Sequence, residues 1–275
     1  MQDEVVARIA EALLGKLAAS KLPERKPPKS VEAYDLCVRA RFLYQRTMAE
    51  AGKEARRLFE QAIALDPEYA EAHAYLAWAH WMGWVNWFEP ADPHRRLALE
   101  IAHRAVGLDP NDALAHTVLG FVLQYEHEYE ASAAHFETAL RLDPNHADTH
   151  SLRSDFLVMQ GRPLEAVEST AKALRLNPHP PAWYYWGKGQ AEYAARQYVV
   201  ATLRHEATYG TPSRSILAAA LAQLGRLEEA RIEGRLFMAD YPDFRIESFL
   251  DTQPFRYRAD REHFADGYRK AALPE

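Results

Sequence analysis

Histidine is the residue type in this chain that is best suited to bind a metal, and the sequence contains 12 of them. His73, His116 and His150 occupy the same position in successive units of a 34-residue repeat, which places them about 10 Å apart or more. They are too far apart to share one ion at bond lengths of about 2 Å. His146 and His150 could chelate an ion together, but no third ligand and no His-Glu-x-x-His sequence accompanies them. We therefore predict structural histidines and no metal site.

The sequence has no catalytic motif. No glycine-rich phosphate loop, no Cys-x-x-Cys pair and no Gly-x-Ser-x-Gly elbow occurs in it. Cys37 is the single cysteine, so an internal disulfide is excluded and a reducing compartment is the simpler interpretation. We predict no catalytic residues and no cofactor, and we expect that the chain is not an enzyme.

The repeat itself is marked by Leu-Asp-Pro or Leu-Asn-Pro at the end of four helical patterns. Pro110, Pro144 and Pro178 follow one another at intervals of 34 residues, whereas the interval from Pro67 to Pro110 is 43, one period plus a nine-residue insertion. A two-helix unit of this length cannot bury its apolar face alone, so the units must stack on one another.

Residues 113–144 resemble the tetratricopeptide repeat. Gly120 and Ala139 are small where the two helices of a unit cross closely, Phe136 fills the gap to the next unit, and Pro144 ends the second helix. The same frame fits about six units. The resemblance implies an all-α fold, a right-handed superhelix of helical hairpins with an N-terminal helix and a C-terminal capping helix.

The six tryptophans fall in two clusters, one in the second unit and one in the fifth. Rigid aromatic side chains with a polar tip form binding hot spots. The alternative is that the rings pack between superhelical turns or on the insertion at 81–93, to which we assign Trp84, Trp87 and Phe88. In tetratricopeptide repeats the first helices line the concave face, so the resemblance predicts a partner-binding set there: Tyr44, Trp78, Trp81, Phe121, Gln124, Arg153, Asp155, Trp186, Gln190 and Tyr193.

Arg153 stands where a tetratricopeptide repeat carries leucine. A buried arginine needs a partner, because an unpaired buried charge costs on the order of several kcal/mol. Either it forms a polar centre in the groove that recognises a carboxylate or phosphate, or it pairs internally with Asp148, Asp155 or Glu192.

Composition narrows the class of partner. The net charge is −6, and the 33 basic and 39 acidic residues are intermixed, which argues against the concentrated basic face of a nucleic-acid-binding protein. The sequence contains no run of about 18 apolar residues, so it predicts no membrane-spanning helix. The N-terminus lacks the pattern of a secretory signal, so we expect a cytoplasmic protein without a membrane partner.

The two ends differ from the middle of the chain. Residues 2–19 have the apolar spacing of an amphipathic helix, and residues 21–29 read as a basic, proline-rich linker. Residues 244–250 and 259–271 look helical and would cover the last apolar face. We expect three regions: an N-terminal helix and Pro/Lys-rich linker at 1–30, tetratricopeptide repeats at 31–242, and capping helices at 243–275.

The ends also carry a second resemblance. The opening helix, the sequence Ala-Tyr-Asp-Leu at 33–36 and the tail segments at 260–264 and 269–275 are similar to the C-terminal repeat region of bacterial multidomain regulators with a TolB-like domain. These regulators include adenylate or guanylate cyclase proteins and winged-helix transcription regulators. The resemblance implies a fragment or a family member without an upstream output domain, and no cyclase catalytic residue can be matched.

The sequence therefore favours a non-enzymatic scaffold or regulatory module that binds a partner peptide or helix in an aromatic concave groove. In this hypothesis Trp78, Trp81, Phe121 and Trp186 bury apolar partner side chains, and polar groups of the set fix the backbone or charge. The alternative is a sensory or oligomerisation domain in which a small molecule or a second copy controls an attached cyclase or transcription-regulator domain.

Overall fold

The computed structural model of this protein describes residues 26–44, 49–85, 91–199 and 213–275. Over these ranges the chain forms helices and no strand, so the predicted all-α class is confirmed. The helix expected at 2–19 and the end of the fifth unit lie outside the described residues. No described helix is both long and apolar enough to span a lipid bilayer.

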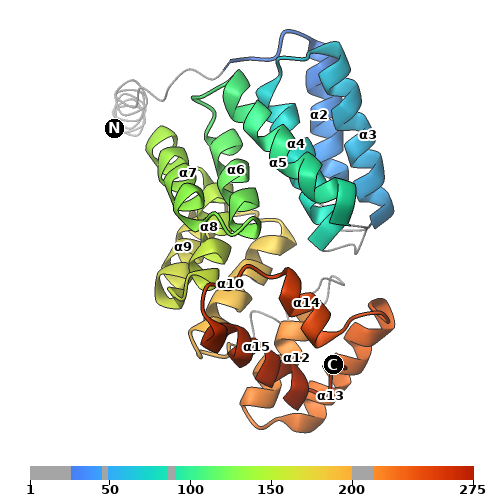
Figure 1. The fold of residues 1–275 in the computed structure, drawn as a ribbon, viewed down its shortest axis with the longest axis vertical. Helices are drawn as coiled ribbons and strands as arrows, with labels where there is room; N and C mark the ends of the chain where they lie inside the picture. Colours follow the sequence, from blue (N-terminus) through green and yellow to red (C-terminus); the bar gives the residue numbers. More distant parts are fainter. Residues whose placement is uncertain (1–25, 45–48, 86–90, 200–212) are drawn as a thin grey trace, which may run out of the picture.

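The helices form successive hairpins that stack into a superhelix (Figure 1). The first helices of the units pack on one another to form an inner row, and the second helices lie outside them. The inner row is α2 (Val31–Tyr44), α4 (Ala70–Val85), α6 (Ala113–Tyr125), α8 (Ala147–Met159), α10 (Ala182–Ala194) and α12 (Ser213–Gln223). The outer helices are α3 (Ala49–Leu65), α5 (Ala91–Leu108), α7 (Tyr129–Leu142), α9 (Pro163–Leu176) and α13 (Leu227–Asp240).

Small residues set the distance between the helices of a hairpin. A Cβ atom added to Gly120 would lie 3.0 Å from the carbonyl oxygen of Ser132 on the partner helix. The Ser132 hydroxyl donates a 2.6 Å hydrogen bond to the Gly120 carbonyl. Phe136 packs on Phe156 of the next unit, with ring centroids 5.4 Å apart. These contacts explain the small and large residues that define the repeat.

His73, His116 and His150, which share one position of the repeat, lie at the turns between units. In each case the histidine Nε2 atom lies 3.0–3.1 Å from the carbonyl oxygen of the repeat proline, in the pairs His73–Pro67, His116–Pro110 and His150–Pro144. Each ring therefore bridges the turn to the helix that follows it, which is a structural role. Among the described residues, no three His, Cys, Asp or Glu side chains gather into a metal site.

The nine-residue insertion lengthens both helices of the second unit. Helix α4 has 16 residues against 13 in the inner helices α6, α8 and α10, and helix α5 has 18 against 14 in the outer helices α7 and α9. Trp84 lies in the added turn of α4, where the Arg95 guanidinium is 5.6 Å from the ring centroid. Trp87 and Phe88 fall outside the described residues.

Two further helices close the C-terminal end, α14 (Ile246–Thr252) and α15 (Arg258–Lys270). α15 packs on α12 and α10. The segment between α14 and α15 reaches back to the fourth unit, where the Arg256 amide donates a 2.9 Å hydrogen bond to the Met159 carbonyl. The chain end is fixed too, because the Ile246 amide donates to the Pro274 carbonyl at 2.9 Å.

Candidate functional site: two hollows on the inner face

Aromatic rings from three helices pack together on the inner face. Phe121 lies between the indoles of Trp78 and Trp81, with centroid distances of 6.5 and 4.7 Å. Trp81 also contacts the ring of Tyr125 edge to face at 5.2 Å. Trp78 meets Trp183 of α10 edge to face at 5.4 Å. The first and second halves of the superhelix therefore touch across its inner face.

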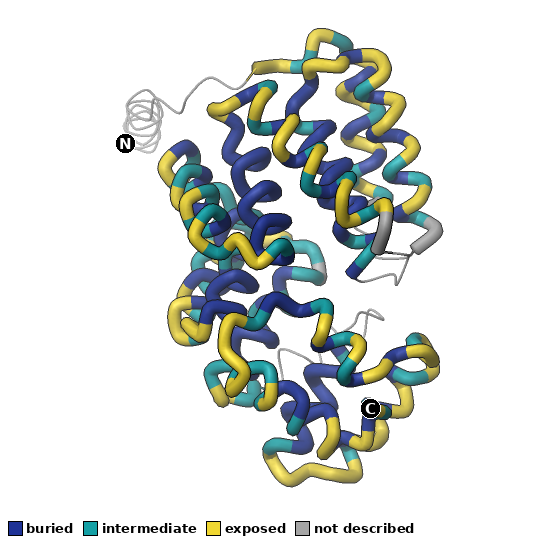
Figure 2. The backbone as a smooth tube through the Cα atoms, in the orientation of Figure 1, coloured by how far each residue is buried: buried dark blue, intermediate teal, exposed yellow. Residues whose placement is uncertain are grey.

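The predicted open, ring-lined trough is wrong. Trp78, Trp81 and Phe121 are only 5%, 3% and 2% exposed. The inner row is buried along most of its length in Figure 2, and every residue of α6 is buried. The reason is that α4 and α10 meet through their indoles, so the rings cover one another. Trp186 is half-buried and keeps part of its ring accessible.

Three polar side chains form a hydrogen-bonded row across three inner helices: Gln124 on α6, Asp155 on α8 and Gln190 on α10. The Gln124 amide nitrogen donates a 2.8 Å hydrogen bond to Asp155 Oδ2, and the Gln190 side chain also hydrogen-bonds this carboxylate. Burial raises the pKa of Asp155 to about 6, although both hydrogen bonds act in the opposite direction. All three side chains are buried, so the prediction that they face a partner in an open groove is wrong as well.

The polar row is incompletely satisfied. Gln124 Oε1, Asp155 Oδ1 and Gln190 Oε1 are buried and have no hydrogen-bond partner within the described residues. Buried polar atoms in native proteins are normally paired, because leaving one unpaired costs about 1–3 kcal/mol. Of these three residues, Gln190 is the one that also lines a hollow.

Arg153 does not belong to the inner face. It is half-buried, and burial together with Arg162 lowers its pKa, whereas Glu165 and Glu137 raise it. The alternative in which Arg153 pairs with Asp148, Asp155 or Glu192 is wrong too, because the acidic groups that act on it are Glu165 and Glu137. The acidic neighbours of Arg153 lie on the outer helices α7 and α9.

Tyr193 and Tyr44 also differ from the prediction. Tyr193 is fully buried under α15, where its ring stacks on His263 at 4.7 Å and its hydroxyl donates to the His263 carbonyl at 3.1 Å. It therefore holds the C-terminal helix rather than a partner. Tyr44 ends α2, and its side chain lies outside the described residues.

Two hollows remain on either side of the Trp78–Trp183 contact. The first, the N-terminal hollow, encloses about 510 Å³ that is partly continuous with solvent. It combines both signs of charge with indole rings, and it is lined by Arg41, Tyr75, Trp78, Asp148, Asn177, Pro181 and Trp183.

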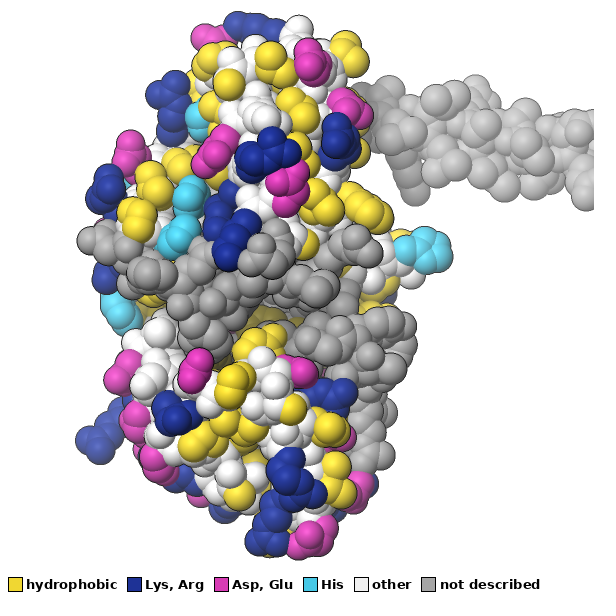
Figure 3. Space-filling model, turned by 90° about the vertical axis from the view of Figure 1, so that its right-hand side faces the viewer, with side chains coloured by type: hydrophobic (Ala, Val, Ile, Leu, Met, Phe, Trp, Pro, Cys, Tyr) yellow, Lys and Arg dark blue, Asp and Glu magenta, His cyan; other side chains and the backbone are white. Residues whose placement is uncertain are grey.

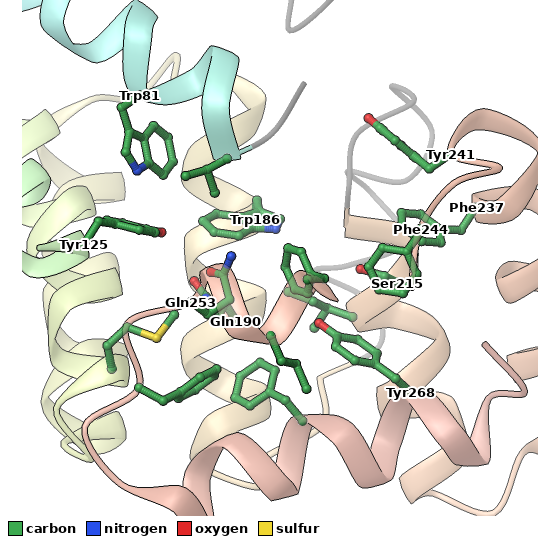
Figure 4. A pocket seen from close by; sticks show the side chains of 17 residues that line it. Trp81, Tyr125, Trp186, Gln190, Ser215, Phe237, Tyr241, Phe244, Gln253 and Tyr268 are labelled. Atoms are coloured by element: carbon green, nitrogen blue, oxygen red, sulfur yellow. The ribbon is translucent and has the colours of Figure 1, made fainter. Parts of the chain in front are cut away.

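The second, the aromatic hollow, lies between the inner helices α4, α6 and α10 on one side and the segment from α12 to α15 on the other (Figure 4). Its protein-free space is about 660 Å³, part of it open to solvent. Trp81, Tyr125, Trp186 and Gln190 form the wall contributed by the repeats. The opposite wall consists mainly of aromatic and aliphatic side chains from the segment that runs from α12 to α15, including Phe237, Phe244, Phe264 and Tyr268. Ser215 and Gln253 are its polar members.

Sequence reasoning missed Arg41, Asp148 and Trp183 of the N-terminal hollow, and the aromatic side chains that the C-terminal helices contribute. One signal was present. Trp78 and Trp81 are three residues apart on α4, and Trp183 and Trp186 are three apart on α10, so each helix presents two indoles on one face.

Charged side chains of both signs are mixed on the described part of the face shown in Figure 3. On the face in Figure 3, Lys and Arg side chains are interspersed with Asp and Glu and with apolar side chains. Many form local pairs, such as Arg226–Glu229 and Arg162–Glu165.

The profile of the tetratricopeptide repeat family matches residues 52–83 and 117–181. Solved repeat structures share the fold. PilW, a type IV pilus biogenesis factor, is 20% identical with a TM-score of 0.53, covering 74% of this chain and 90% of PilW. The chain is a tetratricopeptide repeat protein.

Two other similar proteins carry unrelated functional descriptions. The human IFIT1 dimer, solved with m7Gppp-AAAA, has a TM-score of 0.61 at 17% identity, covering 98% of this chain and 66% of IFIT1. Putative adenylate cyclase 3 of Rhizobium meliloti strain 1021 is 33% identical over 128 residues, 46% of this chain. This tetratricopeptide repeat protein spans 22% of that cyclase's length. The low-identity structures establish the fold alone.

Proposed function

We propose that this tetratricopeptide repeat protein is a non-enzymatic interaction module that binds a segment of a partner protein in the N-terminal hollow. The supporting observation is the juxtaposition in one hollow of the Arg41 guanidinium, the Asp148 carboxylate and the Trp78 and Trp183 indoles. A peptide offers the complementary set: carboxylate or carbonyl oxygens for the guanidinium, amide or ammonium groups for the carboxylate, and apolar side chains for the rings.

Arg41 is held in place for this role. Its Nη1 atom donates a 3.0 Å hydrogen bond to Glu71, and the guanidinium lies 4.8 Å from the centroid of the Tyr75 ring. Its side chain is nevertheless 41% exposed, so one edge stays accessible to a partner. A guanidinium fixed on an aromatic face loses little conformational freedom when it binds an anion.

Asp148 is oriented from the other side. Its Oδ1 accepts the Tyr184 hydroxyl, and the carboxylate stands in the first turn of α8, where the helix dipole favours negative charge. The half-buried Trp183 ring beside it offers an apolar surface. Together these groups would select a segment with an acidic group, an amide or basic group and an apolar side chain.

Selection from a random peptide library on the full chain tests this function. A selected peptide is expected to bind at least about tenfold more weakly to Asp148→Asn, Arg41→Gln and Trp183→Leu in calorimetric titration, the loss of about 1.4 kcal/mol for each. Trp84→Leu is the matched control, because this indole is half-buried outside both hollows. Equal affinity for all four variants would refute the proposed binding site.

A second candidate, regulation through self-association, is favoured by the first helix. Four large apolar side chains at helical spacing on α2 are exposed, Val31, Tyr34, Val38 and Phe42, at 86%, 51%, 40% and 67%. Such a stripe is suited to pack against the same helix of a second copy. The similarity to the Rhizobium meliloti cyclase supports the idea that the repeats regulate an attached output domain.

Light scattering, which measures the molar mass in solution, tests whether the chain self-associates. The chain is expected to form a dimer at micromolar concentration, and Phe42→Glu is expected to make it a monomer. Ile232→Glu, which changes a 48% exposed apolar residue on α13, is the control and should leave the dimer intact. A monomeric wild type would leave peptide binding as the function.

A further inference from the structure

We propose that the aromatic hollow binds an uncharged small molecule with an aromatic body and one hydroxyl or amide group. This site is separate from the N-terminal hollow, and the inference does not depend on peptide binding there. It rests on the unpaired polar atoms at one side of the hollow and on the chemistry of its walls.

The polar side of the hollow presents both an acceptor and a donor. Gln190 lines the hollow, and its amide is oriented by Asp155, because a carboxylate accepts hydrogen bonds and so selects the amide nitrogen. Gln190 Oε1 is buried and has no hydrogen-bond partner within the described residues, and the same is true of Nε1 of Trp81, which also lines the hollow. A ligand hydroxyl or amide can donate a hydrogen bond to Gln190 Oε1.

The hydroxyl of Tyr125 adds to this polar side. In Figure 4 the ring of Tyr125 points its oxygen toward Trp186 and the interior of the hollow. Burial raises the pKa of this phenol well above its usual range, so the group stays protonated and can donate or accept a hydrogen bond.

The rest of the hollow selects an apolar, neutral body. None of the described side chains that line it is charged, and most are aromatic or aliphatic. A charged ligand would lose its hydration without gaining an ion pair. The half-buried Trp186 lies at the centre of the hollow in Figure 4, where a flat ring could stack between it and the aromatic side chains of the opposite wall.

Occupancy would tie two parts of the molecule together. Trp186 and Gln190 stand on α10, whereas Phe244 precedes α14 and Phe264 belongs to α15, so a ligand between them would contact repeats and C-terminal helices at once. Because it would bind only the folded chain, it should raise the midpoint of thermal unfolding as its concentration increases.

Calorimetric titration of the full chain with 2-naphthol, naphthalene and 2-naphthoate tests the proposal. We expect 2-naphthol to bind most tightly, with naphthalene and the charged naphthoate each at least about tenfold weaker, a difference of about one hydrogen bond in the case of naphthalene. Gln190→Met removes the amide at similar volume and should remove the preference for 2-naphthol over naphthalene. Trp186→Leu should weaken both, and it serves as the test if Gln190→Met does not fold.

Trp183→Leu is the matched control, since this half-buried indole lies one turn earlier on the same helix but in the other hollow. It should weaken a selected peptide and leave 2-naphthol binding unchanged, with the reverse result for Trp186→Leu. The proposal is overturned if wild type binds none of the three probes, if it binds 2-naphthol and naphthalene equally, or if Trp186→Leu retains wild-type affinity. None of these outcomes changes the result for the peptide, so the two proposed sites are tested independently.

Discussion

The indole of Trp78 on α4 meets the indole of Trp183 on α10 edge to face, with ring centroids 5.4 Å apart. The two helices belong to the second and fifth units, so this contact joins segments that are distant in the repeat. It divides the inner face into the N-terminal hollow on one side and the aromatic hollow on the other. The next indole along each helix, Trp81 or Trp186, lines the aromatic hollow.

The Trp78–Trp183 pair should be energetically coupled. Edge-to-face aromatic pairs contribute about 0.5–1.5 kcal/mol beyond the area that they bury. In a double-mutant cycle of Trp78→Leu and Trp183→Leu, we expect a coupling of about 1 kcal/mol in the free energy of unfolding, measured by urea denaturation. A parallel cycle of Trp78→Leu with Trp84→Leu should be additive. Additivity in the first cycle would mean that the contact does not hold the two halves together.

Asp155 should make stability fall as pH rises. Its pKa is raised to about 6 in the folded protein from an ordinary value of 3.8. Between these values the folded state binds more protons than the unfolded state. Protonation of Asp155 therefore contributes its full share to the free energy of unfolding below about pH 4, and this share is lost as the pH rises through about 6. Asp155→Asn removes this charge and should stabilise the protein at pH 8 by about 3 kcal/mol.

The Asp155→Asn advantage should disappear near pH 4, where the wild-type carboxyl is protonated and resembles the amide. Urea denaturation at pH 4, 6 and 8 measures both ends of the comparison. Glu165→Gln, at an exposed position on α9, is the control for removing a carboxylate. A pH-independent difference between Asp155→Asn and wild type would contradict a titrating buried carboxyl.

The hairpins and the inner row could be predicted from sequence, because both depend on local spacing. The 34-residue period places Trp78, Phe121, Asp155 and Gln190 on inner helices, and the structure has them there. The period does not report how tightly the superhelix coils, which is set by contacts between units far apart in sequence. The contact of Trp78 with Trp183 is such a contact, and it buries rings that were expected to face solvent.

Arg153 and Tyr193 illustrate two further limits. A polar residue at an apolar repeat position was interpreted as part of the groove, but the structure places the acidic neighbours of Arg153 on the outer helices. Tyr193 was placed by the repeat frame, which contains no information on where α15 packs. Contacts made by a non-repeating segment have no counterpart in the repeat, so the aromatic hollow could not be foreseen.

Gly267 should be indispensable for docking α15. A Cβ atom there would overlap the Tyr193 hydroxyl and lie 2.9 Å from the Cβ of Ala219 on α12. Gly267→Ala must displace α15 or Tyr193, and we expect a loss of about 1–3 kcal/mol in the free energy of unfolding. Gly107→Ala on α5 is the matched control, because an added Cβ meets nothing within 4 Å. It should stabilise the helix by about 0.5–1 kcal/mol, and equal effects of the two variants would refute the close packing.

The linker before α2 is bound along the turns between units. The Lys29 amide donates a 2.7 Å hydrogen bond to Asp66 Oδ2, and the Lys26 amide donates one of 2.9 Å to Asp109 Oδ2. Residues three apart in an extended chain are separated by about 10 Å, which matches the spacing of neighbouring hairpins. The aspartates of two successive Leu-Asp-Pro turns therefore bind successive amides of the linker.

Asp66→Asn should release this linker locally. The charge-assisted bond to the Lys29 amide becomes a neutral one, and we expect amide exchange at Lys29 to accelerate about tenfold, the equivalent of about 1.4 kcal/mol. Mass spectrometry of a peptide spanning 26–30 can assign the effect, because Pro27 and Pro28 have no amide hydrogen. Asp143→Asn is the matched control: Asp143 makes the same turn in the next unit, accepting the Asn145 amide at 3.0 Å. Equal acceleration by Asp143→Asn, or unchanged exchange in Asp66→Asn, would mean that the turn aspartates do not hold the linker.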